Sequence, residues 1–132
     1  MDKRYRKRIL IIEIEQPEEE KLDKEINWVC YSLGLADKGD KLATAIFREL
    51  VLAAKNKEGV SSREITDKEG VTQGAVVYHL NNFIRSGVVV RRGRTYFLRA
   101  PTLDRTLEEI EHDMVRRVRM IRKMARLIDD NL

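Results

Sequence analysis

Hydrophobic and polar residues follow two different periods along the chain, and the changes of period divide it into helices and strands. Residues 9–15 are rich in β-branched residues and end in an alternation of Ile and Glu, which predicts a strand. Pro17 and the glutamates after it are typical of a helix N-terminus, and apolar residues then recur at helical spacing up to Gly34. A strand and a helix are therefore expected before residue 40.

Three more helices are predicted in the next stretch, because each begins with a recognisable N-cap. Asp40, Ser61 and Thr72 each precede an apolar-periodic run and carry a side-chain oxygen suited to capping. Glu64 completes a capping box with Ser61. The predicted helices cover residues 41–57, 62–70 and 73–86.

Strand-forming residues follow these helices. Val88–Val90 and Thr95–Leu98 predict two strands joined by a tight turn at Arg92-Gly93. Pro101 closes the expected hairpin.

The last segment, from Thr102 to the end, has the pattern of one long helix. Its apolar residues follow one another in steps of three and four, as in a coiled coil, with one extra four-residue step between Met114 and Val118 that locally straightens a left-handed supercoil. These positions form a seam that we expect to mediate dimerisation. The seam consists of Leu103, Leu107, Ile110, Met114, Val118, Ile121, Ala125, Ile128 and Leu132.

Charge is segregated along the chain in a way that the net charge of +4 conceals. Residues 1–8 form a basic arm, residues 9–40 are an acidic extension, and residues 41–100 carry eleven basic against five acidic side chains. The C-terminal helix, residues 101–132, is balanced, with seven side chains of each sign. A concentrated basic segment attracts polyanions, of which nucleic acid is the commonest, although a solvated charged surface has the same composition.

The composition argues against several classes of protein. With 42% hydrophobic and 36% charged residues among 132, the chain is expected to be a soluble domain, and its longest apolar run, Ile9–Ile12, is too short to cross a membrane. Cys30 is the only cysteine, which fits a reducing, cytoplasmic location. The sequence has no glycine-rich phosphate loop, nucleophile elbow or His-Glu-x-x-His motif, so we expect no enzymatic activity. We interpret His79 as a packed or helix-surface residue and His112 as part of a solvated acidic face, and predict neither a metal nor a cofactor.

Residues 41–100 have a recognisable order of elements: helix, short helix, turn, helix and hairpin. The stretch Ser61–Ile65, the break at Gly70 and the run Val71–Val89 resemble the ArsR-like winged helix-turn-helix regulators. The long C-terminal helix resembles archaeal members of that broad group, in which such helices usually form dimers. The resemblance implies a mostly α-helical winged helix-turn-helix fold with a small β-hairpin wing, and a DNA-binding regulator of transcription.

In such a fold the helix over residues 73–86 is the recognition helix, whose N-terminal residues reach base edges in the major groove. Gln73 is the candidate for reading adenine, because its amide both donates and accepts, and Val77 is a candidate for contact with a thymine methyl group. Thr72 is expected to cap the helix, to contact phosphate, or to do both. The residues of this helix expected to face DNA are Thr72, Gln73, Gly74, Val77, Tyr78 and Asn81.

The predicted wing supplies positive charge. Arg91, Arg92 and Arg94 flank its turn and are expected to contact phosphates or the minor groove, or alternatively to protect an exposed strand edge. The stretch from Thr72 to Ile84 contains no Lys or Arg, which argues against strong guanine readout. DNA binding is therefore expected to depend strongly on salt. Further basic contacts are expected from Arg63, Lys68, Arg85 and the N-terminal arm.

The long helix is acidic over residues 101–113 and basic over residues 114–132. This polarity has a simple interpretation as matching to the helix dipole. Antiparallel pairing with the same helix of a second copy would also explain it, since each acidic half would face a basic half. Packing on the acidic helix at Pro17–Leu33 is a third interpretation, compatible with the second.

The sequence thus predicts a homodimer, joined by antiparallel C-terminal helices, that binds an inverted-repeat operator in double-stranded DNA. The alternative is a winged helix that serves as a protein-interaction module without specific DNA binding, which an uncharged recognition helix would suit.

Overall fold

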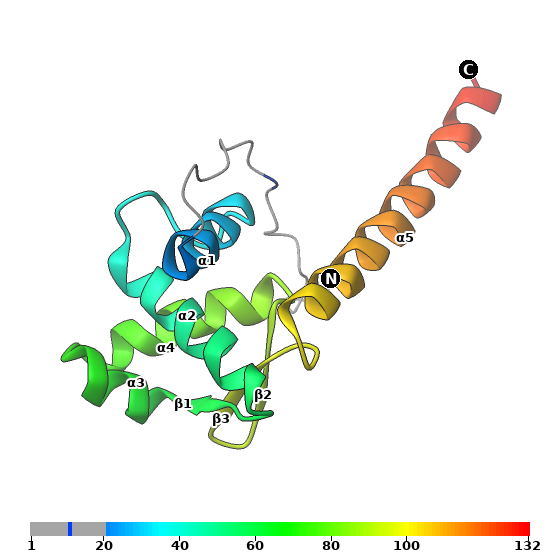
Figure 1. Ribbon diagram of the computed structural model, residues 1–132. Coiled ribbons are helices and arrows are strands. Elements are labelled where there is room, and N and C mark those ends of the chain that lie inside the picture. The colour runs from blue at the N-terminus through cyan, green and yellow to red at the C-terminus, as the bar shows by residue number, and fades with distance from the viewer. Residues whose placement is uncertain (1–10, 12–20) are drawn as a thin grey trace.

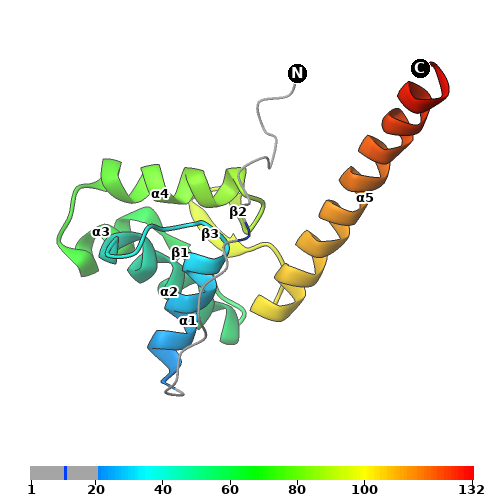
Figure 2. The same ribbon diagram turned by 90° about the horizontal axis from the view of Figure 1, so that it is seen from above.

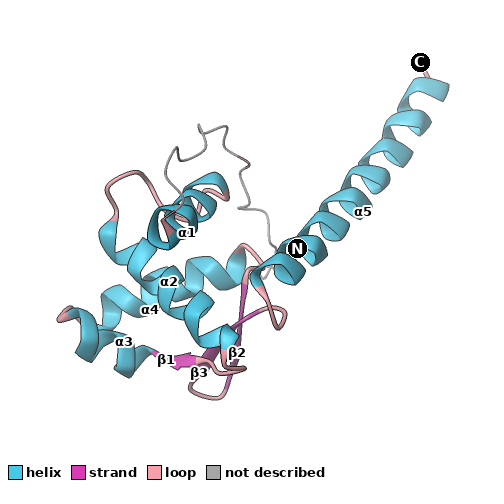
Figure 3. Cartoon of the chain, viewed as in Figure 1, coloured by secondary structure: helices cyan, strands magenta, loops and turns pink. Residues whose placement is uncertain are grey.

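The computed structural model describes Ile11 and residues 21–132, and within these residues five helices and three short strands follow one another (Figures 1 and 3). The predicted basic arm, the predicted strand at 9–15 except for Ile11, and the helix start at Pro17 lie outside the described residues. The elements are α1 (Leu22–Ser32), α2 (Lys41–Lys55), β1 (Val60–Ser61), α3 (Ser62–Glu69), α4 (Gln73–Arg85), β2 (Val89–Arg92), β3 (Thr95–Leu98) and α5 (Leu103–Asp130).

The predicted N-caps are confirmed by side-chain hydrogen bonds. The Asp40 carboxylate accepts from the backbone N–H of Ala43 at 3.1 Å, which caps α2. The Thr72 hydroxyl accepts from Ala75 N–H at 3.2 Å and caps α4. Ser61 caps α3 in the same way. Each cap satisfies a backbone donor that the helix itself leaves unpaired.

The strands form one antiparallel sheet in the order β1-β3-β2. The predicted hairpin is confirmed, but its loop is Gly93-Arg94 rather than Arg92-Gly93, because Arg92 pairs with Thr95 as the last residue of β2. Val88, predicted to start the strand, precedes β2. The strand β1 was not predicted, since two residues are too few to show a period.

Gly59 explains how this short strand reaches the sheet. A Cβ atom at this position would lie 2.5 Å from the backbone oxygen of Tyr96 and 2.7 Å from a ring carbon of Phe97. Glycine is therefore required for the turn after α2 to pack directly against β3.

The core lies between α2, α4, the sheet and the inner face of α1, which packs on α2 (Figures 1 and 2). Phe47 of α2 and Phe83 of α4 meet edge to face at its centre, with ring centroids 6.2 Å apart. Both side chains are fully buried, as expected from the apolar stripes of the two helices. Other members of the core are Ile26, Cys30, Ile46, Leu50, Ile65, Val76, Leu80, Val88, Val89, Tyr96 and Leu98.

Helix α2 ends in a Schellman motif that makes it shorter than predicted. The N–H of Lys57 donates to Ala54 O at 2.9 Å, and the N–H of Glu58 donates to Ala53 O at 3.0 Å. Lys57 takes the left-handed conformation, with φ of 58°, at a position where glycine is usual. It is the only residue other than glycine with a positive φ in the described part of the chain.

Replacement Lys57→Gly is expected to raise the free energy of unfolding by about 0.5–1 kcal/mol. The left-handed conformation costs a residue with a side chain about 1–2 kcal/mol, and glycine removes this cost. Glycine is also more flexible in the unfolded chain, which lowers the gain in stability by about 0.5–1 kcal/mol. Urea denaturation measures the change. The neighbouring replacement Lys55→Gly, inside the last turn of α2, should instead lower the stability by about 1 kcal/mol. A loss of stability in Lys57→Gly would contradict the assignment of strain.

The buried thiol of Cys30 makes the free energy of unfolding depend on pH in the alkaline range. Burial, with a smaller contribution from the nearby Asp40 carboxylate, raises the pKa of the Cys30 thiol from its ordinary value of 9.0 to about 12. Between these two values the unfolded chain loses the thiol proton and the folded chain keeps it, so stability falls as pH rises. We expect a decrease of about 1.4 kcal/mol per pH unit in that window, measured as the difference from Cys30→Ala. An identical pH dependence in the two proteins would contradict it.

Helix α5 is fixed to the rest of the molecule only near its start and then projects away from it (Figures 1 and 2). The fully buried hydroxyl of Thr106 accepts from Ala100 N–H at 3.1 Å and donates to Thr102 O at 2.8 Å. These bonds hold the first turn of α5 against the segment that leaves β3. None of the helices in the described residues is both long enough and apolar enough to cross a membrane.

Candidate nucleic-acid interface

The side chains of α4 divide into a buried face and an exposed face. Val76, Leu80 and Phe83 are buried in the core, at the spacing of successive helical turns. Of the residues predicted to face DNA, Val77 is half-buried and the others are exposed. The exposed ones are Thr72, Gln73, Gly74, Tyr78 and Asn81.

Gln73, the predicted base-reading residue, is held by Ser62, a contact that was not predicted. Its Nε2 donates to the hydroxyl of Ser62, at the start of α3, over 3.2 Å. The second Nε2 hydrogen and the amide oxygen stay available to a ligand. The bond fixes the amide before any ligand arrives. Ser62 lies eleven residues before Gln73, and no local pattern in the sequence indicates that the two side chains meet.

Tyr78 and His79 form a second feature of α4. The Tyr78 side chain is 62% exposed, and its ring meets that of His79 edge to face with centroids 5.4 Å apart. His79 Nε2 lies 3.8 Å from the Asp40 carboxylate, and the His79 side chain is only 15% exposed. His79 therefore packs against the loop before α2, in agreement with the interpretation as a packed side chain. No group of three or more metal-binding side chains is found within residues 21–132.

The β2–β3 hairpin presents the three predicted arginines at its end. Its two-residue loop begins with Gly93 at φ of 62°, as the tight hairpin turns require. Arg91 lies over the ring of Tyr96 and donates from Nε to Gly93 O at 2.8 Å, whereas Arg92 lies over the ring of Phe97. Successive side chains of a strand point to opposite faces, so Arg91 and Arg92 lie on opposite faces of the hairpin. Arg91, Arg92 and Arg94 are all exposed.

The other predicted cations differ in their availability. Arg63 on α3 and Arg85 at the end of α4 are exposed, and Arg85 also bonds to the amide oxygen of Asn82. Lys68 forms an ion pair with Glu49 at 2.8 Å, and this hydrogen bond, together with the negative charge of Glu49, raises the pKa of Lys68. Lys68 is therefore partly neutralised, and Arg63 and Arg85 are the freer cations near α4.

Arg99 joins the sheet to α5 rather than extending the basic hairpin. Its guanidinium lies 2.6 Å from the Asp113 carboxylate and 3.0 Å from that of Glu109. The bond to Asp113 is the largest cause of the raised pKa of Arg99. Arg105 in turn pairs with Glu108 and Glu109. Much of the acidic half of α5 is thus neutralised within the chain.

The predicted dimerisation seam is divided between two environments. Ile110 is buried in the core of its own chain, and Leu103 and Leu107 are half-buried against it. Leu33, which follows α1, lines a groove of about 630 Å³ together with residues of α5. The start of the seam is therefore covered within its own chain, and packing of α5 on α1 itself, one of the three interpretations, stays a prediction. The exposed remainder is Met114, Val118, Ile121, Ala125, Ile128 and Leu132.

Comparisons of the chain with protein-family models, with curated proteins and with solved structures found no match.

Proposed function

We propose that this protein is a sequence-specific DNA-binding regulator of transcription with a winged helix-turn-helix domain of the ArsR-like type. The observation that carries the proposal is the exposed polar face of α4, which follows a short helix and a tight turn and precedes an arginine-tipped hairpin. In this arrangement α4 enters the major groove and the hairpin contacts the backbone or the minor groove. Phosphate contacts supply affinity, and α4 supplies sequence preference.

Gln73 would read adenine in this binding mode. A glutamine amide binds adenine with one accepted and one donated hydrogen bond. The Ser62 hydroxyl uses one Nε2 hydrogen of Gln73 and leaves the groups that adenine requires. An amide that is already oriented loses less conformational entropy on binding, which favours specificity.

We further propose that two copies pair through the exposed part of α5, so that two copies of α4 reach an inverted repeat. Met114, Val118, Ile121 and Ile128 are between 39% and 68% exposed, an apolar surface too large for one isolated helix in water. Coiled-coil pairing covers such a seam. A groove beside Met114 and Val118 gives room for a second helix.

An antiparallel pair of α5 helices suits this segment best. With the axis level with residue 123, Met114 faces Leu132, Val118 faces Ile128 and Ile121 faces Ala125 of the other copy. The same register brings the acidic residues 129–130 near the basic side chains at 116 and 117, whereas parallel pairing sets like charges together. The acidic half of α5 is not needed for this complementarity.

A second candidate function is that of a protein-interaction module. Two features of α4 favour it: the absence of Lys and Arg between Gln73 and Ile84, and the exposed aromatic ring of Tyr78. Tyrosine is enriched where proteins bind one another.

Equilibrium binding to DNA distinguishes the two functions. The protein is titrated with its own upstream DNA and with scrambled DNA of equal length across a series of salt concentrations. A regulator should bind the upstream DNA more tightly by a factor of about 10³ or more, with an affinity that falls steeply with salt. Equal, weak binding to both DNAs that is lost at physiological salt would support the interaction module.

Replacement Gln73→Ala is expected to remove the preference for adenine at one position of each half-site. The loss of a bidentate contact corresponds to about 1–3 kcal/mol of discrimination, and the salt dependence should stay unchanged because no phosphate contact is lost. Ser62→Ala should reduce the same preference by a smaller factor. Binding to a set of single-base operator variants measures both effects. A uniform loss of affinity for all variants would contradict a base-reading role.

A further inference from the structure

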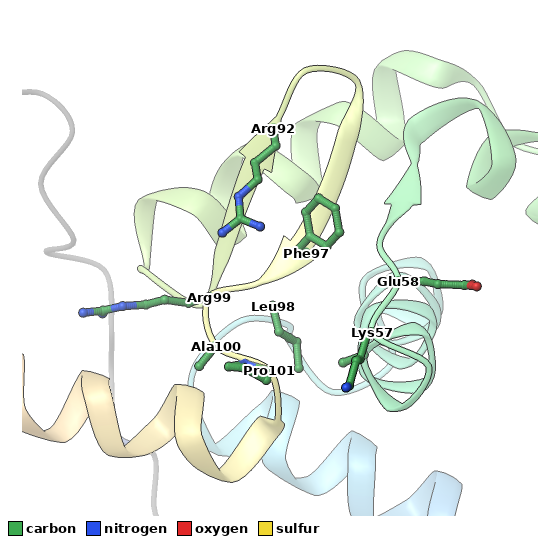
Figure 4. Close-up of a pocket in the computed structure, with 9 residues that line it drawn as sticks. Lys57, Glu58, Arg92, Phe97, Leu98, Arg99, Ala100 and Pro101 are labelled. Atoms are coloured by element: carbon green, nitrogen blue, oxygen red, sulfur yellow. The ribbon is translucent and has the colours of Figure 1, made fainter.

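A groove on the outer side of the hairpin lies where α2, the sheet and the start of α5 meet (Figure 4). It has a volume of about 310 Å³, and its apolar lining includes Phe97, Leu98 and Pro101. Lys57 and Arg92 also line it, and Figure 4 shows Phe97 and Leu98 between them. A second hollow, of about 420 Å³, shares Lys57 and Pro101 with it and lies next to the first turn of α5.

The charged side chains around this groove leave it with net positive charge. The carboxylate of Glu58 points away from the groove, and Arg99 points towards the acidic residues of α5 that neutralise it (Figure 4). Within the described residues, neither Lys57 nor Arg92 has an ion-pair partner. Two cations beside an apolar surface are the features that bind an amphipathic anion.

The strained backbone of Lys57 is a second, independent indication. A glycine would satisfy the Schellman motif without strain, and Lys55 already provides a positive charge at the C-terminus of α2. Strain of this kind concentrates at binding sites. The tight packing of Gly59 on Phe97 also fixes the turn that carries Lys57 against the floor of the groove.

We propose that this groove binds a small aromatic carboxylate. The ring lies on Phe97 and Leu98, the carboxylate is bound by Arg92, and the positive charge of Lys57 across the groove adds to the attraction. A volume of about 310 Å³ is at the lower end of the range for small-molecule sites, which fits a ligand of one or two rings.

The site connects ligand binding to DNA binding through Arg92, and this step rests on the proposed function. A guanidinium that binds the ligand's carboxylate is not free to bind a DNA phosphate. The ligand therefore weakens DNA binding by competing for a residue of the hairpin.

The test is a titration of the full-length, isotope-labelled protein with benzoate, followed by backbone amide NMR. Benzoate is expected to shift the signals of residues 57–59 and 97–101 in a saturable way, and its neutral isostere benzamide to bind at least about 10-fold more weakly. Arg92→Ala and Lys57→Gly are each expected to weaken benzoate binding by about 5- to 10-fold. Arg94→Ala is the matched control, because it removes a charge from the same hairpin without lining the groove.

Several outcomes would overturn the proposal. Equal affinity for benzoate and benzamide would exclude recognition of the carboxylate. Shifts confined to α5, or benzoate affinity unchanged in Lys57→Gly, would place the ligand elsewhere. Because Lys57→Gly is expected to be more stable than the native protein, its loss of binding cannot come from unfolding.

A second arm separates this proposal from the proposed function. Benzoate is expected to weaken binding to the upstream DNA for the native protein but not for Arg92→Ala. Failure to bind any DNA specifically would reject the proposed function while leaving benzoate binding intact. If the affinity for the upstream DNA does not change at saturating benzoate, only the proposed competition between benzoate and DNA for Arg92 is rejected.

Discussion

Simultaneous replacement of Arg91, Arg92 and Arg94 by alanine is expected to abolish DNA binding at physiological salt. The exposed face of α4 has no cation between Gln73 and Ile84, so the hairpin carries much of the attraction to phosphate. Each lost phosphate contact should reduce the slope of log K against log salt by about 0.9, and three losses correspond to an affinity lower by about 100-fold or more. Fluorescence anisotropy over a salt series measures both quantities.

The matched control removes the same charge from another surface. By helical spacing, Arg119, Lys123 and Arg126 lie on the side of α5 opposite the exposed seam. They belong to the part of α5 that projects away from the hairpin (Figure 1). Their replacement by alanine should leave the salt slope nearly unchanged. Equal losses of affinity in the two triple variants would show that DNA responds to overall charge, and the hairpin would then have no special role.

The double replacement Val118→Glu and Ile121→Glu is expected to convert the dimer to a monomer and to weaken operator binding by about 100-fold or more. Both side chains are more than half exposed in the single chain and face the second copy in the antiparallel pair. Burying carboxylates in that seam is strongly unfavourable. A monomer binds each half-site independently and loses the effective concentration that linkage provides. Analytical ultracentrifugation gives the state of assembly.

Arg119→Glu with Lys123→Glu is the control for this variant, because it introduces the same residue on the polar side of α5. It should remain a dimer. A native protein that sediments as a monomer at all accessible concentrations would contradict the proposed pairing. A Val118→Glu, Ile121→Glu variant that remains dimeric would show that the exposed seam does not mediate dimerisation.

The helices and their starts were the most predictable part of the fold. Asp40, Ser61 and Thr72 act locally, through hydrogen bonds to residues three positions later, and a local interaction leaves a local signal in the sequence. The burial of Phe47 and Phe83 also follows from helical spacing. The hairpin was located correctly because its loop contains Gly93, although the loop itself begins one residue later than expected.

The missed features depend on contacts between distant segments. Strand β1 exists because Gly59 lets the chain approach β3, thirty-six residues later in the case of the Val60–Tyr96 pair. The bonds of Arg99 to Glu109 and Asp113 were not predicted, because they depend on the direction in which α5 leaves the sheet. The hydrogen bond from Gln73 to Ser62 similarly needs the angle between α3 and α4. No periodicity contains such information.

The way in which α5 is attached makes it a lever. Thr106 and Arg99 clamp its first three turns, and its 28 residues extend about 42 Å at about 1.5 Å per residue. A rotation of about 10° at that clamp moves the far end by about 7 Å, which is close to two base-pair steps of DNA at about 3.4 Å each. Small adjustments at the joint beside Pro101 would therefore set the distance between the two halves of a dimer, and with it the operator spacing that the protein accepts.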